Sequence, residues 1–205
     1  MHFIAGHPWR HSGAFGLPSV GGTRYSPTVP ATDDTVRVKD AYCSYCGNAF
    51  VHPEPDWPRR CAHCGGTTYR NPLPVAVALL PVRRGTDPLG LAVVRRTIEP
   101  GRGQLALPGG FIDHGETWQE ALVRELGEET GIPADVNEVR LADTLSSRAG
   151  HLLVFGLLEE RNITRLPLSV PTDETEGWEF LPAPIELAFP LHTRAARCWF
   201  DGLYV

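Results

Sequence analysis

The sequence of 205 residues has no apolar run that approaches the ~20 residues needed to span a bilayer. Its first residues, MHFIAGHPWRHSG, lack the charged segment followed by an apolar segment that marks a secretory signal. Internal repeats are absent as well. These absences argue against a membrane-spanning or secreted protein, so we expect a cytoplasmic protein with no membrane partner.

Positive charge is not in excess either. The formal net charge is −5; residues 1–74 carry seven Arg/Lys against five Asp/Glu, and residues 75–205 carry twelve against nineteen. The acidic C-terminal part lacks the basic footprint of a protein that binds nucleic acid regardless of sequence, and it suits divalent cations better. With 42% hydrophobic and 21% charged residues, the chain has an ordinary globular composition, sufficient for one sizeable core and a small appendage.

Two Cys-x-x-Cys pairs, each followed by glycine, stand in the N-terminal part. They are Cys43/Cys46 and Cys61/Cys64, with fourteen residues between the pairs. This pattern is typical of paired zinc knuckles, and four thiolates close a tetrahedral site. We therefore expect a structural Zn²⁺ that folds a ribbon and takes no part in chemistry. Disulfides would need a secreted chain, and a thioredoxin-type pair would need a βαβ context. His52 and His63 remain alternative ligands.

Three segments are expected along the chain. Residues 1–38 are rich in Gly, Pro, Ser and Thr and read as a flexible leader, residues 39–72 as the zinc ribbon, and residues 73–205 as the main domain. Apolar runs at 75–80 and 89–94 predict an antiparallel pair of strands, and further strands are expected at 104–107, 139–147, 151–158 and 178–181. With helices at 118–130 and 191–200, this mixture predicts an α/β sandwich with helices on a mixed sheet.

The first of these helices has its acids in an unusual place. A capping box of Thr117 and Glu120 predicts its start, and Gly131 with Pro133 predicts its end. At ~100° per residue, three carboxylates fall on or beside the apolar stripe, namely Glu125, Glu128 and Glu129. Glu120 and Arg124 fall opposite, as i,i+4 partners. Like charges at positions 125 and 129 are tolerable only with a bound cation or raised pKa values.

The spacing around this helix carries a family resemblance. Gly110, five residues, Glu116, seven residues and then Arg124-Glu-Leu-Gly-Glu-Glu-Thr-Gly-Ile132 match every defined position of the Nudix box. The sequence thus resembles the Nudix hydrolases over residues 41–202. These enzymes hydrolyse nucleoside diphosphates linked to another moiety, and they have an α/β/α sandwich in which the box forms a loop-helix-loop that holds Mg²⁺ or Mn²⁺.

The resemblance implies roles for individual residues. Glu125, Glu128 and Glu129 would bind the metal beside the backbone carbonyl of Gly109, Arg124 would orient this cluster, and Glu116 would brace it. Oxygen ligands of this kind suit Mg²⁺. A cation would neutralise a diphosphate and lower the pKa of the attacking water, and no Ser, Cys or Lys of the box is suitably activated for covalent catalysis.

Two questions stay open in this scheme. Glu125 is the first candidate for the general base, and Glu174 or Glu176, in a later loop, are alternatives. Three arginines flank the strand before the box and are candidates for binding the distal phosphate, namely Arg95, Arg96 and Arg102. Solvated loop acids and surface arginines are the simpler interpretation of these residues.

A four-Cys ribbon joined to a Nudix domain resembles the NADH pyrophosphatases, but their SQPWPFPxS motif is missing. Three short segments are similar to the zinc-ribbon Nudix group that includes the plastid FAD pyrophosphatases: Asn71-Pro72, Arg96-Thr-Ile-Glu-Pro100 and Glu186-Leu-Ala-Phe189. We expect a small nucleotide substrate of the FAD, NADH or ADP-ribose type, with FAD first; a homodimer remains open. Two alternatives are a Nudix-fold ligand-binding protein without significant hydrolysis, and a ribbon whose main role is contact with protein or nucleic acid.

Overall fold

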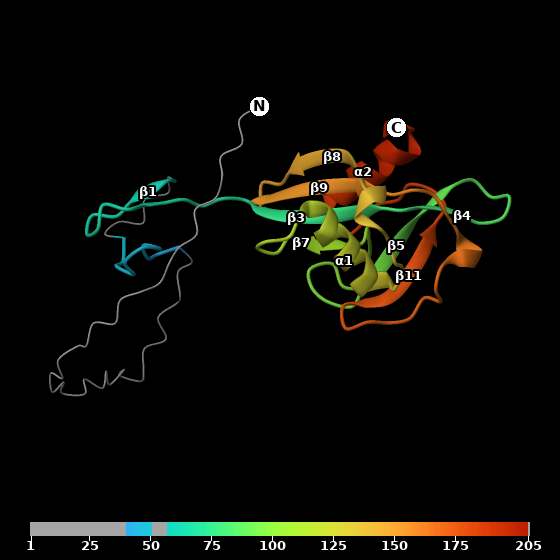
Figure 1. The fold of residues 1–205 in the computed structure, drawn as a ribbon, viewed down its shortest axis with the longest axis horizontal. Coiled ribbons are helices and arrows are strands. Elements are labelled where there is room, and N and C mark those ends of the chain that lie inside the picture. Colours follow the sequence, from blue (N-terminus) through green and yellow to red (C-terminus); the bar gives the residue numbers. More distant parts are fainter. Residues whose placement is uncertain (1–39, 51–56, 205) are drawn as a thin grey trace, which may run out of the picture.

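The computed structural model describes residues 40–50 and 57–204. The expected leader and His52 lie outside these residues. Figure 1 shows the four-Cys segment apart from the main domain, at the end of an extended stretch of chain. In this segment β1 (Arg59–Arg60) pairs with β2 (Thr67–Thr68) in antiparallel register. No helix among the described residues is both long and apolar enough to cross a membrane.

The main domain contains two sheets. The first has the order β7-β3-β9-β8, in which β3 and β9 are parallel and the other pairs are antiparallel. Its strands are β3 (Leu73–Leu79), β7 (Gly109–Phe111), β8 (Arg140–Ser146) and β9 (His151–Leu157). The sheet is therefore mixed, as the sequence predicted.

The second sheet has the order β10-β4-β5-β11, and β6 also pairs with β5. Here β10 and β4 are parallel, and the other pairs are antiparallel. Its strands are β4 (Pro81–Arg83), β5 (Gly90–Arg96), β6 (Leu105–Ala106), β10 (Arg161–Asn162) and β11 (Thr175–Leu181). Short 3-10 helices at Val136–Glu138 and Ile163–Arg165 complete the connections.

The expected pairing of the runs 75–80 and 89–94 is wrong. The first run forms β3 in the first sheet, and the second forms β5 in the other. The chain changes sheets between two adjacent residues: the carbonyl of Leu79 accepts the N–H of Leu158, whereas the carbonyl of Leu80 accepts the N–H of Ala92. Pro81 then begins β4, and β4 is the strand that pairs with β5. Sequence alone does not show this switch because the apolar run continues through it.

Two helices cover the sheets, α1 (Trp118–Thr130) and α2 (Pro190–Phe200), and they lie on opposite sides (Figure 1). Val77 packs into an apolar core that includes Ala196 of α2. The next residue, Ala78, packs into a second core that includes Leu122 and Leu126 of α1. Because successive side chains of a strand point to opposite faces, β3 supplies both cores. The arrangement is the expected α/β/α sandwich.

Candidate active site

Helix α1 is fixed at both ends by its own sequence. Thr117 Oγ1 accepts the backbone N–H of Glu120 at 3.3 Å, and a Glu120 carboxylate oxygen accepts the N–H of Thr117 at 2.7 Å. This is the predicted capping box. Gly131 ends the helix in the left-handed conformation, with φ 71°. Leu122 and Leu126 are fully buried, which fixes the rotation of the helix about its axis.

This rotation turns two carboxylates toward the first sheet. Glu129 is 5% exposed and the Glu125 side chain is 15% exposed, whereas the Glu128 side chain is 61% exposed. Helix geometry predicted that all three acids lie on or beside the apolar stripe. Glu125 and Glu129 face the interior of the domain, whereas Glu128 lies at its exposed edge.

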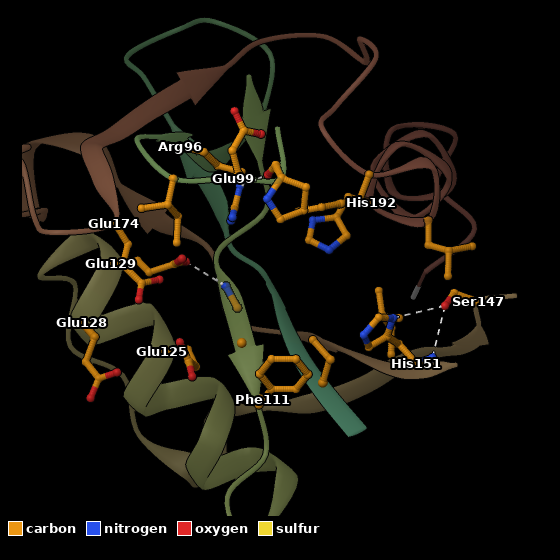
Figure 2. A pocket seen from close by; sticks show the side chains of 18 of the residues that line it. Arg96, Glu99, Phe111, Glu125, Glu128, Glu129, Ser147, His151, Glu174 and His192 are labelled. Carbon is orange, nitrogen blue, oxygen red and sulfur yellow. Dashed lines mark hydrogen bonds between the residues drawn. The ribbon is translucent and has the colours of Figure 1, made fainter. Parts of the chain in front are cut away.

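A cavity of about 1030 Å³ lies over this face of α1 (Figure 2). Glu125, Glu128 and Glu129 line one side of it, and Glu174, from the loop before β11, lies beside them. The rest of the lining comes from strands β3, β7 and β9, from the end of β5 and the loop after it, from the β8–β9 turn and from the start of α2. The cavity thus joins segments that are far apart in the sequence.

Strand β7 approaches the acids because it carries glycines. A Cβ placed on Gly110 would lie 2.4 Å from Glu125 Oε1, which is an impossible contact. A Cβ on Gly109, whose φ is +153°, would lie 2.3 Å from the carbonyl oxygen of Ala76 in β3. The N–H of Gly109 donates to Glu129 Oε2 at 2.9 Å. Backbone, with no side chain, therefore forms the surface opposite the carboxylates.

Burial sets the protonation of these acids. It raises the pKa of Glu129 to about 7, against the opposing effect of the Gly109 hydrogen bond, and nearby Glu125 and Glu174 raise it further. Burial also raises the pKa of Glu125, although the ion pair with Arg124 opposes this shift. In such a cluster each carboxylate charge disfavours the ionisation of its neighbours, and a bound cation would offset this repulsion. Mg²⁺ and Mn²⁺ fit such a site because they prefer hard oxygen ligands.

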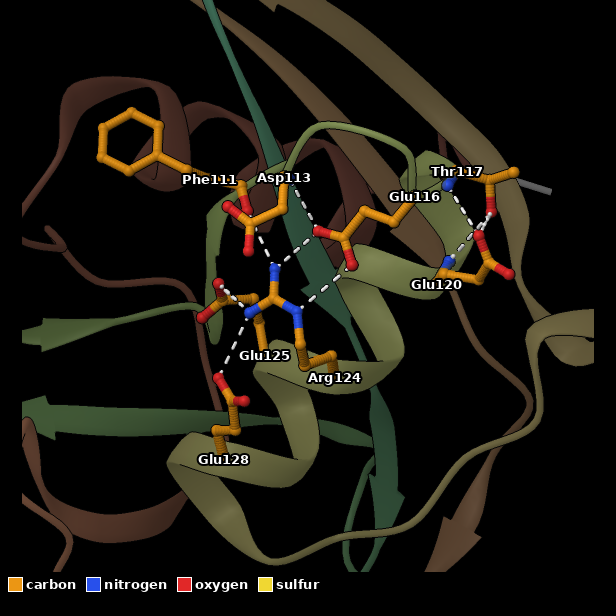
Figure 3. A network of polar contacts seen from close by, with 8 residues as sticks. All are labelled: Phe111, Asp113, Glu116, Thr117, Glu120, Arg124, Glu125 and Glu128. Atoms are coloured by element: carbon orange, nitrogen blue, oxygen red, sulfur yellow. Dashed lines mark hydrogen bonds and ion pairs between the residues drawn. The ribbon is translucent and has the colours of Figure 1, made fainter. Parts of the chain in front are cut away.

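Arg124 links the helix to the loop that precedes it (Figure 3). It donates to both carboxylate oxygens of Glu116, at 2.7 and 3.2 Å, and to the carbonyl of Phe111 at 3.0 Å. It also donates to Glu125 at 2.7 Å and to Glu128 at 3.2 Å. These hydrogen bonds lower the pKa of Glu116 and raise that of Arg124. The predicted i,i+4 pairing of Arg124 with Glu120 is wrong, because the Glu120 carboxylate bonds Thr117.

The four predicted zinc ligands come together. The thiol sulfurs of Cys43, Cys46, Cys61 and Cys64 all lie within 4.8 Å of one another. The Cys46 and Cys61 sulfurs lie 3.7 Å apart and those of Cys43 and Cys64 lie 3.8 Å apart, far above the ~2.05 Å of a disulfide bond, and all four cysteines are free. The N–H of Tyr45 donates to Cys43 Sγ and, as the largest cause, lowers its pKa to about 6. Four such sulfurs fit one tetrahedral zinc ion.

Comparison with known proteins agrees with this geometry. The family model "NUDIX domain" matches residues 72–200. The chain belongs to the Nudix family. The NAD-capped RNA hydrolase NudC of Haemophilus influenzae (strain PittGG) is 36% identical over 91 residues, which is 44% of this chain and 33% of that protein. NudC of Shigella flexneri is 33% identical over the same length. The similarity thus spans about a third of the length of these curated relatives.

Solved Nudix structures share the fold. A NUDIX hydrolase from Nitrosomonas europaea superposes with a TM-score of 0.59 at 22% identity, covering 78% of this chain and 90% of that one. The NUDIX domain of Shewanella oneidensis NrtR, solved with ADP ribose, gives 0.55 at 20% identity, covering 66% and 90%. At these identities the likeness concerns the fold of the Nudix domain.

The position of the cavity distinguishes between the candidates that the sequence left open for the general base and for phosphate binding. Glu174 lines the cavity, whereas Glu176 is 61% exposed and lies 4.0 Å from Arg95. Arg95 in turn bonds both carboxylate oxygens of Glu179. Arg96 lines the cavity and donates to the carbonyl of Pro100, and Arg102 is not part of the lining.

One half of the cavity was not predicted from the sequence. Its residues include Phe111, His151, Leu153, Phe189 and His192. The Phe111 and His151 rings lie 6.1 Å apart, and those of Phe189 and His192 lie 4.9 Å apart. They come from β7, β9 and the start of α2, and no spacing in the sequence connects them. The only sequence feature near these residues was the resemblance of residues 186–189 to the zinc-ribbon Nudix group.

Proposed function

We propose that this Nudix protein hydrolyses the diphosphate bond of a nucleoside diphosphate linked to another moiety, with FAD, NADH or ADP-ribose as the type of substrate, and releases AMP and a second monophosphate. The observation that carries this proposal is that three carboxylates of α1, a helix held by Arg124, line one cavity together with Glu174. The cavity is large enough for more than a diphosphate.

The catalytic cation would be held by Glu125, Glu128 and Glu129, with the Gly109 carbonyl beside them. When bound, Mg²⁺ or Mn²⁺ supplies charge neutralisation for the diphosphate oxygens and acidifies water. Arg124 keeps the first two carboxylates in place, because it bonds both of them and is itself anchored on Glu116. Arg124 would thus position these two carboxylates for the cation.

The proton of the attacking water would pass to Glu125, our first candidate for the base. Its side chain is largely buried, and its raised pKa makes it a better proton acceptor than an ordinary glutamate. Glu174 remains the alternative, because it lines the same cavity from another loop. Glu125→Gln and Glu174→Gln separate the two: the variant that loses the acidic limb of the pH–rate profile, where the rate falls as the base becomes protonated, identifies the base.

The substrate class follows from the other half of the cavity. Aromatic and aliphatic side chains there provide a surface for a heterocyclic ring, next to the site for the phosphates. The curated relatives are hydrolases of NAD-capped RNA, but this chain lacks SQPWPFPxS. We therefore propose a free dinucleotide or nucleotide conjugate, with FAD first because of the short segments around Glu99 and Phe189.

A panel of FAD, NADH, NAD-capped RNA, ADP-ribose and nucleotide sugars, incubated with Mg²⁺, tests the reaction. Turnover in ¹⁸O-labelled water should place one label on one of the two monophosphates and leave no phosphorylated enzyme. Orthophosphate as the first product, or label on a sugar carbon–oxygen bond, would contradict attack on the diphosphate. If FAD is inert while NADH or ADP-ribose is cleaved, the reaction class holds and the FAD assignment is wrong.

A second candidate function is ligand binding without significant hydrolysis. It would show as tight calorimetric binding of a dinucleotide with no turnover at saturating Mg²⁺.

We also propose that residues 39–72 form a structural zinc ribbon and residues 73–205 the hydrolase domain. Deletion of the ribbon should leave the hydrolysis rate per folded molecule unchanged; loss of activity in a folded Nudix domain would show that the ribbon serves the reaction.

A further inference from the structure

His192 is the most deeply buried titratable side chain of the cavity wall that faces away from α1. It is the third residue of α2 and is 5% exposed, yet it lines the cavity. Its ring makes edge contacts with Phe155, at 6.0 Å, and Phe189, at 4.9 Å. Figure 2 shows the far edge of this ring pointing into the cavity, across from the carboxylates of α1.

The ring nitrogen Nδ1 of His192 is sealed from solvent and has no hydrogen-bond partner among the described residues. An unsatisfied buried polar atom costs free energy, and native proteins have few of them. Burial, together with the charge of Arg96, lowers the pKa of the ring to about 3. The imidazole is therefore uncharged at any physiological pH, and a purely structural role at this position would be filled better by Phe or Leu.

The location of the single ring proton follows from the surroundings. A buried N–H without an acceptor is rarer in proteins than an acceptor without a donor. The proton is then on Nε2, which lies on the far edge of the ring, toward the cavity. An N–H donor therefore projects into the half of the cavity that is also lined by Phe111, Leu153 and Phe189.

The start of α2 reinforces this donor character. Helix α2 has eleven residues and begins at Pro190, and its N-cap residue Phe189 provides no side-chain hydrogen bond. The positive end of its dipole lies at the same wall as His192. Both features favour an electron-rich atom on the bound ligand. The apolar neighbours Leu153 and Leu191 favour an uncharged group over a phosphate, which would sit on the carboxylate side with the cation.

We propose that His192 is a specificity-determining residue whose Nε2–H donates a hydrogen bond to an acceptor atom, a carbonyl oxygen or a ring nitrogen, on the uncharged heterocyclic ring of the substrate. This inference rests on the proposed function for the class of ligand. It assigns the apolar half of the cavity to the ring and the carboxylate half to the diphosphate. A ligand without such a ring gains nothing from His192.

Product binding tests the proposal without requiring turnover. Calorimetry would measure AMP, FMN and reduced nicotinamide mononucleotide as probes that carry an uncharged heterocyclic ring, and ribose 5-phosphate, in competition, as the probe without such a ring. His192→Phe keeps a planar ring and removes the donor; His192→Gln places an amide N–H near the position of Nε2. His114→Phe, at an exposed position outside the cavity lining, is the control.

At least one ring-bearing product should bind five- to tenfold more weakly to His192→Phe, which is the loss expected for one hydrogen bond, and within threefold of wild type to His192→Gln. Ribose 5-phosphate and the control variant should show no change. Equal weakening by Phe and Gln would indicate packing and overturn the proposal, as would wild-type binding of every ring by His192→Phe. The probe that responds identifies which ring occupies the wall.

The wild-type protein provides a second readout if the variants fail to fold. Two-bond ¹H–¹⁵N correlation spectra should show a neutral imidazole with its proton on Nε2 between pH 5 and 8. A proton on Nδ1, or a charged ring above pH 5, would overturn the proposal. Separate results would reject the two proposals. Binding that depends on His192 without any hydrolysis would reject only the proposed function. Normal hydrolysis by His192→Phe, with unchanged KM for all substrates, would reject only this inference.

Discussion

The backbone N–H of Gly109 donates a 2.9 Å hydrogen bond to Oε2 of Glu129, and this contact joins the glycine strand β7 to the acidic face of α1. The carboxylate that receives it is 5% exposed. One neutral donor offsets only part of the desolvation of a buried carboxylate, so the pKa of Glu129 stays near 7. Glu129 is thus a group that a cation can deprotonate and bind at neutral pH.

This pKa predicts how stability depends on pH when Mg²⁺ and Mn²⁺ are absent. The pKa of Glu129 rises from 4.5 to about 7 on folding, so the folded state binds more protons between these pH values. This contribution to the free energy of unfolding is full below about pH 4.5, and roughly 2–3 kcal/mol is lost as pH rises through 7. Chemical denaturation at pH 5 and 7.5 measures it. Glu129→Gln should remove this slope; a variant that keeps it would show that another group is responsible.

Substitution of the cavity acids should separate activity from stability. Glu129→Gln and Glu128→Gln should each lower kcat/KM by at least about 100-fold, because each removes a carboxylate from the proposed cation site. Their thermal midpoints should stay level or rise, since like-charge repulsion is relieved. Glu120→Gln is the control on the same helix: it weakens the capping box by about 1 kcal/mol or less and leaves the rate unchanged. A wild-type rate in either test variant would remove that residue from the site.

Two glycines of the Nudix box should respond oppositely to alanine. At Gly110 a Cβ would lie 2.4 Å from Glu125 Oε1, so Gly110→Ala should displace that carboxylate and reduce turnover, with little loss of stability because the end of the Glu125 side chain can move. At Gly127, inside α1, a Cβ meets no atom within 4 Å, so Gly127→Ala should stabilise the fold by about 1 kcal/mol with normal turnover. Urea denaturation and steady-state kinetics measure both variants. Equal effects at the two positions would refute the close approach of β7.

Arg124 should act through the acids that it holds. Arg124→Met removes the bonds to Glu116, Glu125 and Glu128, so we expect kcat/KM to fall about 10- to 100-fold and the requirement for Mg²⁺ to rise. Arg83→Met is the control, since Arg83 forms a comparable paired contact with Glu160 outside the cavity. A titration of rate against Mg²⁺ distinguishes them. An unchanged Mg²⁺ dependence in Arg124→Met would limit this arginine to a structural role.

The structural zinc and the catalytic Mg²⁺ or Mn²⁺ should be distinguishable by experiment. Elemental analysis should find one zinc per chain after dialysis, because four thiolates close its site, while hydrolysis should stop without added Mg²⁺ or Mn²⁺. Cys46→Ser should lose the zinc. The fifth cysteine, Cys198, lies in α2, so Cys198→Ser should keep it. Full turnover without a divalent ion, or zinc bound equally by both variants, would contradict the assignment.

The amino-acid sequence by itself determined the local parts of this protein. The capping box at Thr117, the stop at Gly131 and the apolar stripe of α1 are encoded within one helix, and they fix which acids face inward. The four cysteines likewise lie within one short segment, so their spacing was enough to predict that they meet. Periodicity and capping are short-range effects, and for that reason these predictions needed no knowledge of the rest of the chain.

Only the tertiary structure decided what faces those acids. The switch between sheets at Leu79 and Leu80 was invisible, because an apolar run looks the same whichever partner strand it meets. The tertiary structure also brings Arg124 into contact with Glu116. It places His192, 67 positions after Glu125, on the far side of the cavity. Contacts between residues so distant in the chain depend on how sheets and helices pack, and neither propensity nor spacing encodes that packing in a form that can be read from the sequence.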